Sequence, residues 1–385
     1  MAVYCSESER KADGGVEMTA VSENREVVAT QERFHNIEFL RFVFSVTIVY
    51  FHILHSNIMG LIGENNAYVT LQELSNNAGW IVECFFIISG YFLFASFHKQ
   101  PELPFTMFAL KKVFRLGPVL IFSILTCIVF FGQRLIPSLF NSLFLQCIGL
   151  SLEYKGINWY ISPLFWASLF YYAVIKVLEP KKANVLIAVI VYFSYLVNIS
   201  SCNGGFGRET VYGIVNLGLT RALAGIGLGY LIGVGIETFQ TIGFNYKNKH
   251  TKRGKIAVLT MVELIICIFF VYYFLLGGQY QNKFIVVILF SVLLISFLLR
   301  GGMVSRELNR PVFSLLGKYA YSIYVMQQIS FWILQKTLWR TNIVGRVGLC
   351  ICVSLLFSIL VGVITYYMIE CPFSKLYLNF YIRKD

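Results

Sequence analysis

Charged residues are scarce in this sequence: Asp, Glu, Lys and Arg make up 14% of its 385 residues, whereas hydrophobic residues make up 57%. Soluble globular domains are about 25% charged, so the composition indicates a polytopic membrane protein. The motifs of soluble enzymes are also missing, among them the phosphate-binding P-loop, the Gly-x-Ser-x-Gly elbow and the His-Glu-x-x-His zinc pair. The nine cysteines show no metal or redox spacing, so we expect neither a metal site nor a disulfide framework.

Ten apolar runs predict an all-α integral membrane protein with about ten transmembrane helices, because a crossing takes about 20 residues. We expect residues 1–33 to be a disordered cytoplasmic tail without a cleavable signal, 34–376 a membrane domain and 377–385 a short cytoplasmic tail. The ten runs are residues 37–56, 80–97, 116–132, 159–178, 184–200, 212–236, 256–276, 284–299, 319–338 and 347–369.

The distribution of basic residues orients these spans. If the ambiguous segment 136–150 does not cross, 23 Lys and Arg residues face the cytoplasm and six face outward, as the positive-inside rule requires. We therefore expect both termini in the cytoplasm, a location in the cytoplasmic (inner) cell membrane, and an interfacial or re-entrant 136–150 segment. The net charge of +12 lies in inner loops, which favours anionic membrane lipids and not nucleic acid as partners.

The stretch 36–57 is apolar enough to span, yet it carries ionisable residues, which are costly at membrane depth. Arg41 and His52 are eleven positions apart, so on a helix they share one face about 16 Å apart along the axis. Glu38 precedes Arg41 by three residues and can pair with it, and His55 lies near the same face. A snorkelling Arg41 and a merely buried His52 are the structural alternative.

Other charged positions also fall at or inside the predicted spans. Lys111, Lys112 and Arg115 precede Gly117-Pro118 in what we expect to be an inner loop and helix start, suited either to phosphates or to a membrane anchor. Arg221 lies within a span rich in small residues, where a charge needs a partner or a watery cavity. Small residues every three or four positions predict a close helix-packing face there, as Ser89-Gly90 does in the second span.

Two more candidates lie toward the outer surface. Glu83 opens the second predicted span, where it is either functional or simply hydrated. Trp159 begins a span at the outer interface, where aromatic residues form a belt but can also stack on sugars. A glycine-rich loop, 201–211, is expected on the same side.

Six short motifs in order resemble the acyltransferase-three family, which comprises membrane O-acyltransferases of surface polysaccharides and other glycans. The resemblance runs from about residue 34 to 376. Two positions depart from the family pattern: Lys112 stands for the first of two arginines, and Gln327 stands where many members carry a histidine. The motifs are Glu38-x-x-Arg41 with His52, FFIISGYF, KKVFRLGP, NWYIS, GKYAYSIY and Glu370-Cys-Pro372.

The resemblance implies acetyl or another acyl group moving from cytoplasmic acyl-CoA to a glycan hydroxyl, without a metal. His52 would be the general base, since imidazole titrates near pH 6.5. Arg41 would be a second active-site residue that holds the donor or pairs with Glu38, and the Lys111, Lys112 and Arg115 cations would grip coenzyme A phosphates. Both direct transfer and an acyl-enzyme stay open.

Further roles complete this hypothesis. Glu38, Glu83 and Arg221 would line or support a polar channel for the donor, and Trp159 would contact the glycan acceptor. A secondary transporter, with intramembrane Arg, Glu and His as a proton relay, is the main alternative. A non-catalytic membrane scaffold is a third, favoured by Gln327.

Overall fold

The computed structural model describes residues 34–55, 66–74, 78–147, 157–241, 249–276, 283–338 and 347–382. The predicted tail 1–33 and residues 383–385 lie outside the described residues. Within them, regular structure is helical apart from one antiparallel pair of two-residue strands, β1 (Thr210–Val211) and β2 (Val215–Asn216).

A helix coincides with each of the ten predicted spans. Eight helical segments of the described chain are long and apolar enough to cross a membrane, while α11 has 15 residues and α14 carries several polar ones. The ten helices are α1 (His35–Leu54), α4 (Ile81–Lys99), α5 (Phe105–Phe131), α7 (Ile161–Val177), α8 (Pro180–Ser201), α9 (Leu217–Thr241), α10 (Lys249–Leu276), α11 (Phe284–Leu298), α14 (Ala320–Leu338) and α15 (Val347–Thr365).

Short elements connect these helices. The α6 helix has eight residues and is about 12 Å long, too short to cross, so the described part of segment 136–150 agrees with the expectation that it does not span. The other short elements are α3 (Asn66–Leu74), η1 (Ala78–Trp80), α6 (Leu135–Ser142), η2 (Ile157–Tyr160), α12 (Met303–Glu307), α13 (Pro311–Gly317), the π-helical turn η4 (Tyr366–Glu370) and α16 (Cys371–Ile382).

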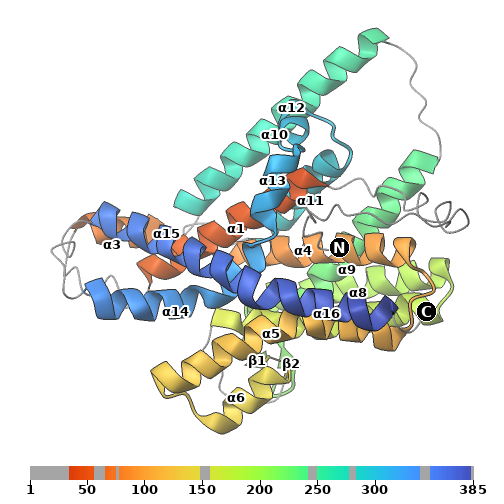
Figure 1. Ribbon diagram of the computed structural model, residues 1–385. Coiled ribbons are helices and arrows are strands. Elements are labelled where there is room, and N and C mark those ends of the chain that lie inside the picture. The colour runs from red at the N-terminus through yellow and green to blue at the C-terminus, as the bar shows by residue number, and fades with distance from the viewer. Residues whose placement is uncertain are drawn as a thin grey trace, which may run out of the picture.

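The first helix, α1, lies among the other helices and packs against α4, α11, α13, α14 and α15 (Figure 1). Large apolar side chains on the outer helices are exposed, for example Val129 on α5, Ile268 on α10 and Leu356 on α15. Charged side chains such as Glu38 and Glu83 are buried instead. This distribution suits a protein whose surroundings are lipid and whose interior must satisfy its own polar groups.

Glycines bring α4 and α9 into close contact, as the small-residue pattern predicted. A Cβ atom at Gly90 of α4 would collide with the backbone carbonyl of Ile226, and one at Gly229 of α9 with that of Ile87. Only glycine allows two helix backbones to approach this closely. The prediction of a packing face is therefore confirmed.

The α1 and α14 helices run side by side in a fixed register. The Ser45 hydroxyl donates to the carbonyl of Ala320 at 3.0 Å, and the ring of His52 contacts Gln327 at 2.9 Å. Both pairs join residues 275 positions apart, so two turns of α1 match two turns of α14. This register determines which α14 side chain meets His52.

One buried acid that sequence reasoning missed has a structural explanation. Glu263 of α10 is 0% exposed, and its carboxylate accepts hydrogen bonds from the hydroxyl of Ser296 at 2.7 Å and from the backbone N–H groups of Gly302 and Ser305 at 3.1 Å. These amides lie at the start of α12, where N–H groups have no partner within the helix. Glu263 thus fastens α12 to α10.

Candidate functional site

The charged face predicted for α1 is present in the structure. Glu38 is 1% exposed, and its carboxylate accepts a hydrogen bond from the Arg41 guanidinium at 2.8 Å. The helix is continuous from His35 to Leu54, so Arg41 and His52 lie about 16 Å apart along its axis. The pair and the imidazole therefore occupy two different levels of one helix.

The cations of α5 lie close enough to the α1 pair to interact with it electrostatically. Lys112 donates to the hydroxyl of Ser168 on α7 at 3.3 Å and interacts electrostatically with Arg41 and Arg115. Arg115 in turn is an electrostatic neighbour of Arg41 and Glu38. Lys112 and Arg115, both half-buried, thus lie within electrostatic range of the α1 pair.

The expectation that these cations lie in a loop at a helix start is wrong. The α5 helix begins at Phe105, two turns before Lys112, and the loop before it is correspondingly shorter than predicted. Lys111 lies at the edge of the group, where it interacts electrostatically with Arg115 and Lys99. The three cations are therefore presented by a helix side, and the N–H groups of the helix terminus contribute nothing to them.

Glu370 completes this group, although sequence reasoning did not assign it a role. Its carboxylate is 6% exposed, accepts a hydrogen bond from the Ser322 hydroxyl at 2.6 Å and has Arg41 and Arg115 as electrostatic neighbours. It ends the π-helical turn η4, just before Pro372. Proline lacks an N–H and crowds the carbonyl four residues earlier, and π-turns are frequent at functional sites.

We call Arg41, Lys112, Arg115, Glu38 and Glu370 the inner cluster. Its three cations exceed its two carboxylates, so a charge of +1 remains when all five are ionised. Among the described residues, the Arg115 guanidinium has no hydrogen-bond or ion-pair partner. Arg115 is half-buried. A cation that is partly withdrawn from water without an acceptor is unfavourable, and the fork of an arginine matches phosphate oxygens. The inner cluster therefore fits an anionic ligand such as a phosphate-bearing donor.

His52 lies at the other level of α1, half-buried, against Gln327 of α14. Its Nδ1 atom is 2.9 Å from Oε1 of Gln327. The neighbouring His55 is exposed and its ring contacts the carbonyl oxygen of its own helix at Phe51, 2.8 Å away. Of the two imidazoles, His52 is the one directed into the helix bundle.

Arg221 and Glu83 pair with each other, a contact that joins α9 to α4. The Arg221 Nε–H donates to the Glu83 carboxylate at 2.5 Å, and its other nitrogens donate to the carbonyls of Gly207 at 3.2 Å and Gly79 at 3.0 Å. Glu83 is 0% exposed, which excludes the alternative that it is merely hydrated. The arrangement favours structural pairing for both residues.

Trp159 covers this pair and is not open to the surface. It is 7% exposed, and the Arg221 guanidinium lies 5.2 Å from the centre of its ring. One aromatic face is thus occupied by a cation, an interaction worth about 2 kcal/mol when desolvated. Acceptor contact by Trp159 stays a prediction that this packing does not favour.

The glycine-rich loop is held by Arg221 and Asn216. Arg221 binds the carbonyl of Gly207, and Asn216 of β2 donates to the carbonyl of the next residue, Arg208, at 3.3 Å. The exposed Arg208 side chain is an electrostatic neighbour of His52 and of Cys147. The buried Arg221 therefore anchors the loop that carries Arg208, an electrostatic neighbour of His52.

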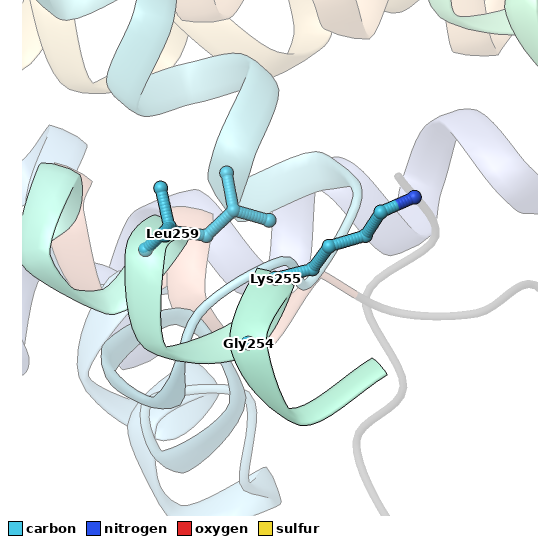
Figure 2. A pocket seen from close by; sticks show the side chains of 4 residues that line it. Gly254, Lys255 and Leu259 are labelled. Atoms are coloured by element: carbon cyan, nitrogen blue, oxygen red, sulfur yellow. The ribbon is translucent and has the colours of Figure 1, made fainter. Parts of the chain in front are cut away.

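A surface pocket lies elsewhere, on α10, lined by Gly254, Lys255, Val258 and Leu259 (Figure 2). It contains none of the residues predicted for a site. The inner cluster and His52 are the stronger candidates for chemistry.

The comparisons with known proteins identify a family. The model of the acyltransferase-three family, described as an acyltransferase domain, matches residues 34–366, a range that includes Glu38, Arg41, His52 and the α5 cations. Neither the curated proteins nor the solved structures gave a match.

Proposed function

The chain belongs to the acyltransferase-three family of membrane acyltransferases, and from this premise we propose that it is an O-acyltransferase acting on glycans. The acyl group, in the first instance acetyl, comes from cytoplasmic acyl-CoA and is transferred to a hydroxyl of a surface or lipid-linked glycan. The enzyme resides in the cytoplasmic membrane. Family membership favours this function over a secondary transporter or a scaffold.

The observation that carries the proposal is the arrangement along α1. The inner cluster has an excess cation, and its Arg115 has no hydrogen-bond or ion-pair partner among the described residues, whereas His52 lies about 16 Å from Arg41 along the axis. A donor with phosphates at one end and a thioester at the other needs such a separation between its anchor and its reactive end. Arg41, Lys112 and Arg115 would hold the phosphates, with Lys111 at the entrance.

His52 supplies the proton chemistry. Its imidazole takes the proton of the acceptor hydroxyl while the hydroxyl oxygen bonds to the acyl carbon and the carbon–sulfur bond breaks. The same proton then passes to the departing sulfur, which leaves as a thiol. Acyl-CoA contributes an activated acyl group, and no metal is needed for this sequence of steps. Arg208, an electrostatic neighbour of His52, would stabilise negative charge on the acyl oxygen.

Sealed vesicles of known orientation test the proposed sidedness. Right-side-out vesicles loaded with labelled acetyl-CoA are expected to acylate an added impermeant glycan, whereas acetyl-CoA added outside is not expected to support the reaction. Purified protein in detergent should transfer the label irrespective of side. Modification of the added glycan only by inside-out vesicles would contradict an outward-facing acceptor site, and absence of any transfer or hydrolysis in detergent would contradict the acetyl-CoA reaction.

Replacing Lys112 or Arg115 by alanine is expected to weaken coenzyme A binding by roughly 1.5–3 kcal/mol, since charge-assisted hydrogen bonds to phosphate are lost. That is about 10-fold to 150-fold in Kd, with the larger effect for Arg115 because its fork can bind two oxygens. Equilibrium binding of coenzyme A to the purified protein measures it.

Lys182→Ala is the matched control for this pair. Lys182 is exposed and pairs with Glu179 at 3.1 Å at the start of α8, so its loss should leave coenzyme A binding unchanged. Wild-type affinity in both the Lys112→Ala and Arg115→Ala variants would show that these cations do not bind coenzyme A and would favour their alternative role as membrane anchors.

A further inference from the structure

Gln327 determines which nitrogen of His52 carries a proton. The Gln327 side chain is 0% exposed, and its Nε2 amide nitrogen donates to the carbonyl of Tyr324 at 2.8 Å. The reverse orientation would place two oxygens against each other at Tyr324. The amide oxygen therefore faces His52, and because an amide oxygen only accepts hydrogen bonds, Nδ1 of the imidazole must carry the hydrogen.

A neutral imidazole has one N–H and one lone pair, so a hydrogen on Nδ1 leaves the lone pair on Nε2. A general base can act only through the nitrogen that lacks the hydrogen. We propose that Gln327 is a positioning residue that holds His52 in the Nδ1–H form and leaves Nε2 to receive the proton of the acceptor hydroxyl. This inference rests on the proposed function, in which His52 is the base.

The register of α1 and α14 makes this contact a fixed one. The Ser45–Ala320 hydrogen bond lies two turns away on both helices. Because of it, α14 cannot slide along α1 and carry Gln327 away from His52 without breaking that bond. Gln327 is also uncharged, so its effect on His52 comes from the hydrogen bond and not from a charge. Among the described residues, the charged and titratable groups that interact electrostatically with His52 are His55 and Arg208. Neither lies on α14, so both are unchanged in every variant of that helix.

Two substitutions of Gln327 separate positioning from simple packing. Gln327→Glu still accepts from Nδ1–H but adds a negative charge, which stabilises the protonated imidazole. We expect this variant to keep activity at alkaline pH, while the acidic limb of its pH–activity profile moves to higher pH. Gln327→Met removes the acceptor, so Nδ1 has nothing to donate to and the hydrogen moves to Nε2. Its kcat should fall about 10-fold or more, with the KM for acetyl-CoA unchanged.

Ser330→Ala is the matched control, because Ser330 is buried on the same helix and, within the part of the chain that the structure describes, its hydroxyl donates to the backbone carbonyl of Met326 and to no other group. It should leave both the profile and kcat as in the wild type. An acidic limb that does not move in Gln327→Glu, or a wild-type kcat in Gln327→Met, overturns the inference. If Gln327→Met does not fold, the profile of Gln327→Glu decides alone.

The His52→Ala variant separates this inference from the proposed function. Loss of transfer in His52→Ala together with wild-type behaviour of both Gln327 variants would overturn the positioning role while the base assignment stands. Retained transfer in His52→Ala would overturn the base assignment itself.

Discussion

Replacing His52 by alanine is expected to reduce glycan acylation at least about 100-fold, the usual loss when a general base is removed. Coenzyme A binding should persist, because the inner cluster that would hold the phosphates lies about 16 Å away along α1. Initial rates of transfer from labelled acetyl-CoA, measured together with coenzyme A affinity, separate the two effects.

His55→Ala provides the control for this experiment. His55 is exposed at the end of α1 and contacts its own backbone, so its removal should be much milder. Half of the wild-type activity in His52→Ala would show that His52 is not the base. A larger loss in His55→Ala than in His52→Ala would assign the base to the other imidazole.

Removing Glu83 is expected to destabilise the protein by about 3–5 kcal/mol, because the Arg221 charge would remain buried without its carboxylate. Thermal or chemical unfolding in detergent measures this loss. The double variant Glu83→Leu with Arg221→Met should recover much of the stability, since well-packed apolar residues can replace a buried ion pair.

An exposed ion pair gives the comparison for Glu83. Glu179 and Lys182 also pair, but both are well exposed, and exposed pairs contribute about 0–1 kcal/mol. Glu179→Ala should therefore have little effect on unfolding. Equal stability of Glu83→Ala and wild type would show that the Arg221 charge is satisfied by the carbonyls of Gly207 and Gly79 alone.

The parts of the fold that depend on local pattern were predictable from the sequence. Apolar length located the helices, and the eleven-residue spacing placed Arg41 and His52 on one face of α1. The glycines of α9 were recognisable as a packing face because their spacing alone matches helical turns. The start of α5 could not be recognised from the sequence, because Lys112 and Arg115 interrupt the apolar run although the helix continues through them.

Contacts between distant residues could not be predicted in this way. Glu83 and Arg221 were each recognised as charges that need an explanation, but nothing in their spacing indicates that they pair. Gln327 was noticed only as a departure from the family pattern. Glu370 carried a weaker signal, an acid beside a proline at the end of an apolar run, and only the helix packing places it beside Arg115.

The 275 positions between His52 and Gln327 have a consequence for biosynthesis. At about 5–20 residues per second, α14 emerges from the ribosome roughly 14 to 55 seconds after α1. During that interval Gln327 is absent, so under the proposed positioning role an incomplete chain lacks the contact that orients His52. Glu38 and Arg41 are only three residues apart, so α1 brings its own counter-charge and enters the membrane already neutralised.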